Sequence, residues 1–146
     1  MTPSFDLVPI KVKNGFVVGC VYVRMVRAGI RTYYNIYDFK KKLNVMLNVF
    51  YKNSAIAIAE AHNLDSHNID QLKLMEEDYS KNYIEMTHFR YLYHKTLDQD
   101  KKQVYETRFD DYQQKCISIR NKIDHFICDP TNKFQCAEVI NKANED

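Results

Sequence analysis

Glycine and proline are distributed so unevenly that they divide the chain into two kinds of structure. All three glycines and two of the three prolines lie before residue 30, and the next breaker is Pro130. The one hundred residues from Ile30 to Asp129 therefore contain neither type. A β-rich domain needs turn residues every few positions, whereas helices joined by short polar turns do not. The long stretch is expected to be mainly helical.

The first thirty residues carry the signals of an antiparallel sheet. Asn14-Gly15 is a strong hairpin signal between two short apolar runs, and Ala28-Gly29 marks a second reversal. Side chains alternate between residues 20 and 27, which places Val23 on one face of a strand and Arg24 on the other. We expect two or three strands with an arginine-bearing outer face.

After residue 36 the hydrophobic period becomes that of a helix. Apolar residues recur every three or four positions, which predicts a helix from about Tyr37 to Lys52 with its lysines mostly off the apolar face. Residues 54–60 fit a short strand or a helix equally well, because alanine weakens their alternation. Residues 63–68 are expected to form a polar turn.

The most regular pattern lies in the last third of the chain. Seven apolar residues there are spaced 4, 3, 4, 3, 4 and 3 apart, which predicts one helix over about residues 100–127, packed along its length against a partner. A similar pattern precedes it, and the register slips just before Tyr105. A turn at the slip, capped by Asp98 or Asp100, gives a helical hairpin, whereas a continuous helix would need a locally over- or underwound segment. The seam residues are Tyr105, Phe109, Tyr112, Cys116, Ile119, Ile123 and Phe126.

Together these patterns predict an α+β fold, with a small N-terminal antiparallel β-sheet followed by a mainly helical region that contains a long antiparallel helical hairpin. A chain of 146 residues that is 45% hydrophobic has the size of a single domain. We assign residues 1–62 to a basic β-hairpin plus helix, and residues 63–146 to the helical hairpin and a C-terminal helix. The helical seam could also serve a protein partner or a homodimer.

Hydropathy and cysteine spacing indicate an intracellular protein without membrane, metal or cofactor. No run approaches the ~18 apolar residues that span a bilayer, and the N-terminus lacks the features of a secretory signal. The four cysteines are irregularly spaced and include no close pair of the kind that structural zinc sites use. We expect them to be reduced and largely buried.

Charge separates the two halves of the chain. Residues 1–52 contain nine Lys or Arg and two Asp, a net charge of +7, whereas residues 53–146 contain twelve basic and seventeen acidic residues, a net charge of −5. The basic half could face a polyanion such as a nucleic acid, although an uneven scatter of solvated lysines explains the skew equally well. The candidate nucleic-acid-binding residues are Arg24, Arg27, Arg31, Lys40, Lys41 and Lys42.

A resemblance to known domains involves the same residues. Val21–Val26 would form a first strand, Ala28-Gly29 a turn and Tyr33–Ile36 a second strand. This order resembles the start of the KilA-N and Bro-N domains of large DNA viruses and phages. The resemblance implies a β-hairpin that leads into a helix, DNA binding, and a viral protein with the host nucleus as one expected location. The residues that match the helix start are Asp38, Phe39 and Leu43.

The sequence offers little support for catalysis. The pairs Glu60/His62 and His88/His94 lack a third partner at a recognisable spacing, and no phosphate-binding glycine loop or H-E-x-x-H motif is present. No catalytic residue is assigned. Two functions remain open, a DNA-binding accessory protein that acts through the β-ribbon and helix, and a non-enzymatic helical scaffold. Three tyrosines could either stack on bases or fill the core, namely Tyr33, Tyr34 and Tyr37.

Overall fold

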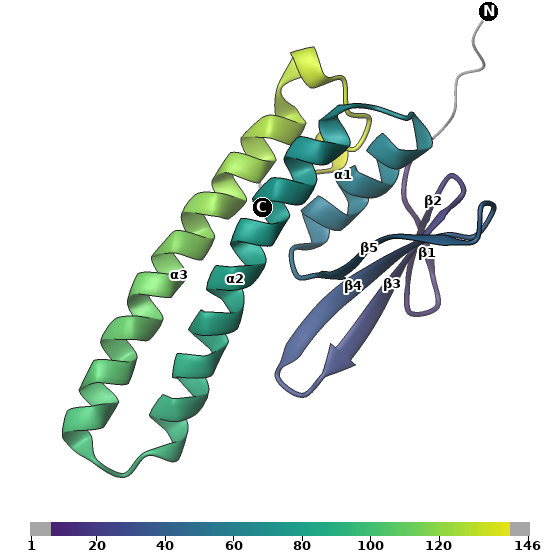
Figure 1. Ribbon diagram of the computed structural model, residues 1–146. Helices are drawn as coiled ribbons and strands as arrows, with labels where there is room; N and C mark the ends of the chain where they lie inside the picture. Colours follow the sequence, from purple (N-terminus) through teal and green to yellow (C-terminus); the bar gives the residue numbers. More distant parts are fainter. Residues whose placement is uncertain (1–6, 141–146) are drawn as a thin grey trace, which may run out of the picture.

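A five-stranded antiparallel sheet is followed by three long helices within residues 7–140, the part of the chain that the computed structural model describes. Figure 1 shows the sheet beside α1, with the α2–α3 hairpin extending past both. The predicted α+β class is therefore confirmed. In chain order the elements are β1 (Ile10–Val12), β2 (Gly15–Val18), β3 (Val21–Ala28), β4 (Arg31–Asp38), β5 (Leu43–Val49), α1 (Lys52–Asn63), α2 (Asn68–Lys95), α3 (Gln99–Cys128) and the short 3-10 helix η1 (Pro130–Asn132).

The sheet is a meander in which each strand pairs with the next. β3 and β4 pair over their whole length and form a ribbon that ends at the predicted reversal, where Gly29 has a φ of +62°. The first predicted hairpin is also present, with Val12 opposite Gly15. A Cβ atom on Gly15 would collide with the carbonyl oxygen of Val23, so close strand approach requires glycine at this position.

The helix predicted from about Tyr37 to Lys52 is wrong. β4 continues to Asp38, the chain turns over residues 39–42, and β5 follows. The apolar residues of this segment fit a helical period, yet alternate positions fit a strand as well, and pairing with β4 buries Val45 and Val49. The partner strand decides between the two periods, because it supplies the hydrogen bonds and one wall of the core.

Side-chain hydrogen bonds explain why the lysine run forms a turn. One carboxylate oxygen of Asp38 accepts hydrogen bonds from the backbone N–H groups of Lys40 (3.0 Å) and Lys41 (2.8 Å). An acidic side chain that bonds to the backbone two and three residues later favours a turn over a continuing helix. Lys42 completes the reversal in the left-handed region, with a φ of +57°.

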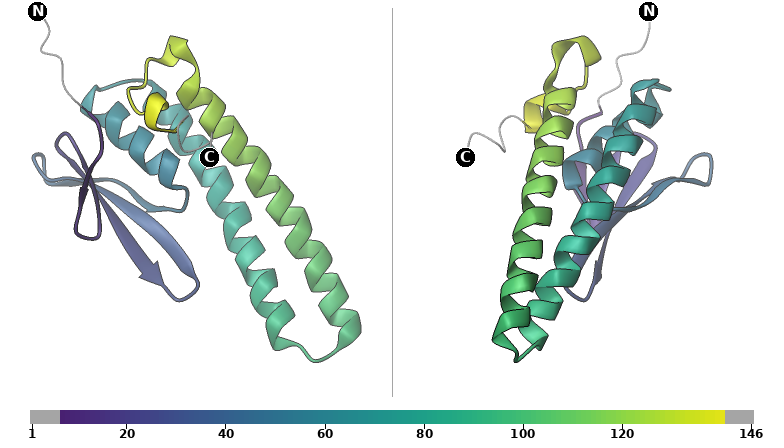
Figure 2. Two further views of the ribbon diagram at one scale, coloured as in Figure 1. Left: turned by 180° about the vertical axis from the view of Figure 1, so that it is seen from behind. Right: turned by 60° about the vertical axis from the view of Figure 1, so that its left-hand side comes forward.

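The hydrophobic core lies between one face of the sheet and α1. Val23 of β3 and its partner Ile36 of β4 are fully buried, as is Ile58 of α1. Residues 54–60, for which strand and helix were both open, are helical, and their alanines are small enough for α1 to approach the sheet closely. Figures 1 and 2 show the helices gathered on this side of the sheet.

The helical hairpin is confirmed, with a turn at residues 96–98. The side chain of Asp98 caps α3, because it accepts hydrogen bonds from the N–H groups of Asp100 and Lys101. The rings of Tyr112 in the seam and Phe89 in α2 are stacked, with centroids 5.8 Å apart, whereas Phe126 at the end of the seam packs against Phe134, with centroids 6.1 Å apart. Cys116, Ile119 and Ile123 are buried, and Tyr105, Phe109, Tyr112 and Phe126 are half-buried.

Beyond η1 the chain turns back onto the core. Phe134, Cys136 and Ile140 are buried there. The carboxylate of Glu60 in α1 accepts hydrogen bonds from the N–H groups of Gln135 and Cys136, both at 2.8 Å. A helical turn occupies residues 137–140, and the rest of the predicted C-terminal helix lies outside the described residues.

Candidate nucleic-acid interface

The face of the sheet opposite α1 carries polar and aromatic side chains. Strand alternation places Tyr22 and Arg24 of β3 on this face, opposite Tyr37 and Asn35 of β4. We call these four residues the open face. Arg24 is exposed, Tyr22 and Asn35 are half-buried, and Tyr37 keeps 36% of its surface exposed. Figure 2 shows the helices on the other side of the sheet, so solvent reaches this face.

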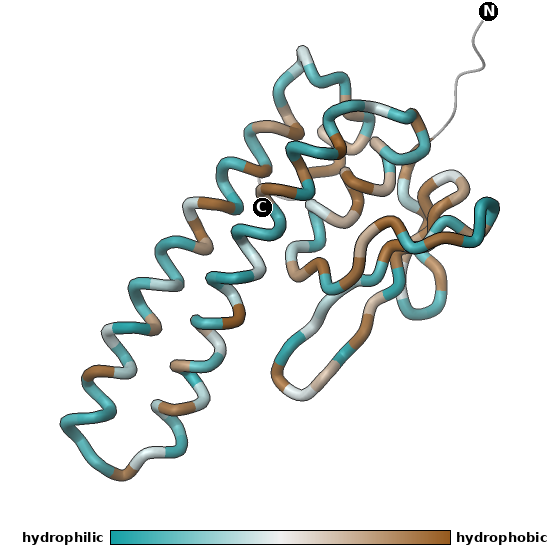
Figure 3. The backbone as a smooth tube through the Cα atoms, in the orientation of Figure 1, coloured by the Kyte–Doolittle hydropathy of each residue, from teal (hydrophilic) through white to brown (hydrophobic). Residues whose placement is uncertain are grey.

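Residues 39–42, which we call the lysine turn, directly follow Tyr37 and Asp38 at one end of the open face. All three lysines of the turn are exposed, and Figure 3 shows this loop as one of the most hydrophilic parts of the chain. Arg24 lies opposite Asn35, three residues before the end of β4, and is therefore about 10 Å from the turn along the strand. A chain of phosphates could contact both groups.

Buried hydrogen bonds fix the shape of the lysine turn. The second carboxylate oxygen of Asp38 lies 2.7 Å from Nε2 of His62 in α1, and the Asp38 side chain is shielded from solvent. The backbone N–H of Lys41, followed by the contact with His62, lowers the pKa of Asp38. Sequence analysis missed this pair and considered Glu60 as the partner of His62. Asp38 and His62 are 24 positions apart, so no local signal could have joined them.

The other two predicted arginines lie at the opposite end of the ribbon. Arg27 is three residues from Arg24 and therefore belongs to the other face of β3. Arg31 is half-buried and holds the ribbon against α2, where its Nε donates to Oγ1 of Thr87 (2.9 Å) and its Nη2 donates to the carbonyl of Ile84 (3.3 Å). The six candidate residues therefore form two groups rather than one surface.

The cations of the open face and the lysine turn have no carboxylate partners. Within residues 7–140, no Asp or Glu lies within ion-pairing distance of Arg24 or of the three lysines of the turn. Unpaired cations keep their full attraction for an anionic ligand, because no internal ion pair must be broken before the ligand binds. The region thus presents three lysines at one end of the sheet and Arg24 nearer its middle.

The three tyrosines that could either stack on bases or fill the core have different surroundings in the structure. Tyr34 is buried, and burial raises the pKa of its hydroxyl. Tyr33 packs against Phe50, with ring centroids 6.1 Å apart. Tyr37 has an accessible ring, and its cross-strand partner Tyr22, which sequence analysis did not single out, lies beside it. Of the tyrosines in the sheet, the Tyr22–Tyr37 pair is the one placed to contact bases from the open face.

The buried carboxyl groups bind backbone rather than substrate. Glu76 of α2 accepts a hydrogen bond from the N–H of Tyr51 (2.8 Å), and burial raises its pKa to about 8. Burial also raises the pKa of Glu60, against the lowering effect of the two N–H groups that it binds. Both carboxyl groups accept hydrogen bonds from backbone N–H groups of other segments, which is a structural role.

Residues 7–140 contain neither a cluster of metal ligands nor a membrane-spanning helix. Between residues 7 and 140, no three His, Cys, Asp or Glu side chains are grouped so that they could hold a metal ion. No helix in this range combines the length and the apolar composition that crossing a bilayer requires. Cys116 and Cys136 are buried, Cys20 and Cys128 are half-buried, and none of these four cysteines is joined in a disulfide.

Comparison of the chain with protein-family models, curated proteins and solved structures found no match. The resemblance of residues 20–44 to the KilA-N and Bro-N domains therefore stays a prediction. One part of what it implies is not formed, because the expected helix start is a strand end at Asp38, a turn at Phe39 and a strand start at Leu43.

Proposed function

We propose that this protein binds nucleic acid, with the open face and the lysine turn as its contact surface. One observation carries the proposal, namely that an uncovered sheet face combines unpaired cations with an accessible pair of tyrosine rings. Lysine and arginine attract phosphate without regard to sequence, and aromatic rings on an open antiparallel sheet can stack on bases. The resemblance of residues 20–44 supports DNA as the ligand and a viral accessory role.

The lysines supply the sequence-independent part of the binding. Each phosphate that a lysine neutralises releases condensed counterions, so the logarithm of the affinity falls linearly with the logarithm of the salt concentration. Arg24 adds a planar donor group nearer the middle of the sheet, where it can contact a phosphate or a base edge. Tyr37 and Tyr22 would contribute stacking, which depends little on base identity.

A salt titration of DNA binding tests the proposal. The test variant is Lys40→Ala, Lys41→Ala and Lys42→Asn, because the positive φ of Lys42 favours Asn over Ala. Its salt dependence should be flatter by roughly one unit of slope for each phosphate that the variant no longer neutralises. The matched control changes Lys81, Lys101 and Lys122, which are exposed on α2 and α3, to Ala. An equal change of the salt dependence in both variants would show that DNA binding depends only on the net charge of the protein.

The scaffold function is the second candidate, and one observation favours it. Leu97, in the turn of the helical hairpin, is 93% exposed, as an apolar contact for a partner would be. The heptad seam itself is occupied, since α2 packs against α3, and a homodimer through the seam would require the two helices to separate. If the wild-type protein has no affinity for DNA or RNA at low salt, the scaffold function replaces the nucleic-acid proposal.

A further inference from the structure

A cleft lies between the tip of the ribbon and the last two turns of α2. It has a volume of about 630 Å³ and is lined by Ile30 of the ribbon turn and by four residues of α2, which are Arg90, Tyr91, His94 and Lys95. We call it the ribbon cleft. Its volume lies in the range of pockets that hold small organic ligands, which is roughly 300–1,000 Å³. Figure 1 shows the tip of the β3–β4 ribbon and the lower part of α2, the two elements that supply its lining.

The two walls of the ribbon cleft are fixed relative to each other. Arg31, next to the ribbon turn, joins this end of the ribbon to α2 through its hydrogen bonds to Thr87 and to the carbonyl of Ile84. Thr87 is itself buried, and its hydroxyl also donates to backbone carbonyls of α2. The cleft begins one helical turn beyond this joint, at Arg90 and Tyr91. A site with preset walls loses less conformational freedom when it binds a ligand.

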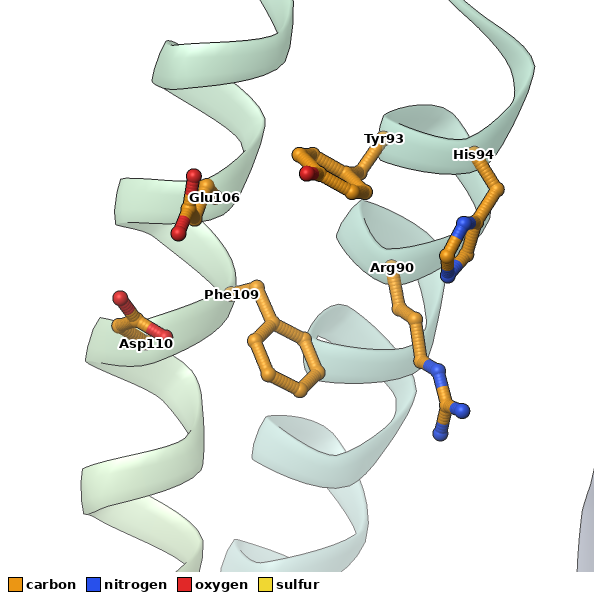
Figure 4. A pocket seen from close by; sticks show the side chains of 6 residues that line it. All are labelled: Arg90, Tyr93, His94, Glu106, Phe109 and Asp110. Atoms are coloured by element: carbon orange, nitrogen blue, oxygen red, sulfur yellow. The ribbon is translucent and has the colours of Figure 1, made fainter.

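The electrostatics of the ribbon cleft favour an anion. Arg90, His94 and Lys95 make no hydrogen bond or ion pair with another side chain of residues 7–140. The adjoining hollow, which Arg90 and His94 also line, contains the acidic side chains of Glu106 and Asp110 of α3. Figure 4 shows them on one side, with Arg90 and His94 projecting on the other side of α2. The positive charges of Arg90 and Lys95 also outweigh the negative C-terminal end of the α2 dipole, which amounts to roughly half a charge.

The remaining surface of the ribbon cleft favours a planar, partly apolar group. Ile30 is 68% exposed and Tyr91 is 51% exposed, and they belong to opposite walls. The Nζ atom of Lys95 lies 5.6 Å from the centre of the Tyr91 ring, so a cation is already placed beside the aromatic surface. An anionic group next to a stackable ring is the chemistry of a nucleotide whose base is unpaired.

We propose that the ribbon cleft binds one unpaired nucleotide of a single-stranded nucleic acid, with its base between Tyr91 and Ile30 and its phosphate at Arg90 and Lys95. This inference rests on the proposed function and specifies its ligand as a single strand. A duplex is too wide to enter the cleft and keeps its bases stacked inside the helix, so it can use only the open face and the lysine turn. The protein should therefore prefer single strands.

Binding of fluorescently labelled oligothymidylate of about 12 nucleotides, a length within the usual single-strand site sizes, tests the proposal. A duplex of equal length and free thymidine monophosphate are measured in parallel, all with the full chain. Tyr91→Ala should weaken single-strand binding about 5- to 100-fold, which is the effect of removing one stacked base, and leave duplex binding unchanged. Tyr91→Phe keeps the ring and should bind as the wild type does.

A charge-matched pair of variants on α2 completes the experiment. Arg90→Gln with Lys95→Gln should reduce single-strand affinity more than Lys73→Gln with Lys81→Gln, because both pairs remove two positive charges but only the first pair lines the cleft. The cleft proposal would be overturned if the Tyr91→Ala variant and the Arg90/Lys95 variant both bound single strands as strongly as the wild-type protein does. The proposed function would still stand in that case.

Two other results would also decide the matter. Monophosphate binding as tight as that of the oligonucleotide would show a pocket for free nucleotides instead of a strand. Absence of any nucleic-acid binding in the wild-type protein would remove this inference and the proposed function together. Tyr91 is half exposed, so its substitution should leave the melting temperature unchanged, which separates loss of binding from loss of fold.

Discussion

The two ends of the α2–α3 hairpin have the same kind of sequence pattern but very different surroundings. At the end near α1 and the sheet, Ile123 and Ile127 of α3 and Leu72 of α2 are fully buried. At the far end Phe109 is only half-buried, because the two helices there contact mainly each other. A heptad pattern thus specifies which residues face the partner helix, whereas a third layer of structure decides how completely they are buried.

This difference separates stability from binding. The buried end contains aliphatic side chains, the two buried carboxyl groups and the returning C-terminal segment. The far end contains half-buried aromatic rings and, on the side of α2 that faces the ribbon, the unpaired cations of the ribbon cleft. Substitutions at the far end should therefore alter ligand binding with little loss of stability, and the reverse should hold near α1. The following predictions test this division, beginning with the largest effect.

Ile123→Ala should cause the largest loss of stability. The side chain is fully buried, and its removal leaves a cavity where α3 meets the other helices. The expected loss is about 3–4 kcal/mol of unfolding free energy, measured by chemical denaturation. A loss below about 1 kcal/mol would mean that this end of the hairpin can collapse around a void, and the contrast with the far end would disappear.

The pH dependence of stability should come from the buried end. The pKa of Glu76 is about 8 in the folded protein, against an ordinary value of 4.5, so folding favours its protonated form. Its contribution is full below about pH 4.5 and is lost as the pH rises to about 8. We expect the unfolding free energy to fall by roughly 3–4 kcal/mol between about pH 5 and pH 8.

Glu76→Gln checks this assignment, because glutamine can still accept the hydrogen bond from Tyr51 but does not ionise. The variant should lose most of the pH slope and be more stable than the wild type at about pH 8. A smaller slope in the same direction should remain, because burial also raises the pKa of Glu60. An unchanged slope would place the titrating group elsewhere.

Phe109→Ala should lower the unfolding free energy less than Ile123→Ala does, although phenylalanine is the larger side chain. Phe109 is half-buried between the helices, near the hollow lined by Arg90 and Glu106. We expect a loss of about 1 kcal/mol, because much of the removed surface already contacts water. Thermal melting of both variants measures the difference, and equal losses would show that the far end is as well packed as the near end.

The smallest effect on stability is expected for Asp38→Asn. Because its hydrogen bonds lower the pKa of Asp38, the contribution of this group is present above the ordinary value of 3.8 and is lost as the pH falls below it. Asparagine should remove part of the acid sensitivity below about pH 4 and lower the melting temperature near pH 7 slightly, because the charge-dependent contribution that is present there is lost. A large loss near neutral pH would instead indicate that the lysine turn supports the whole sheet.

Local patterns were sufficient for some parts of the fold and not for others. The hairpin of α2 and α3 and the cap at Asp98 follow from spacing within one or two turns of helix. β5 was mistaken for a helix because its strand character depends on pairing with β4. Of the candidate site, the exposed positions of Arg24 and the lysines were predictable, but the structural use of Arg31 was not, since its partner Thr87 lies 56 positions away.

The same limit applies to the functional surfaces. The ribbon cleft joins Ile30 to residues of α2, and no spacing in the sequence relates the two. The open face could be anticipated from the alternation in β3, which places Tyr22 with Arg24, but its coverage by helices could not. Sequence reasoning thus identifies charged and aromatic side chains more readily than the spaces between elements.

The capping of α1 by a later helix has a consequence for the order in which the molecule is made. The N–H of Tyr51, at the start of α1, is satisfied by Glu76, 25 positions further on, and Glu60 binds backbone groups 75 and 76 positions further on. A ribosome therefore releases the sheet and α1 long before their partners exist. We expect the nascent chain to remain incompletely folded until residues 135 and 136 have left the ribosome, so that termination before them yields fragments open to proteolysis rather than a free-standing sheet domain.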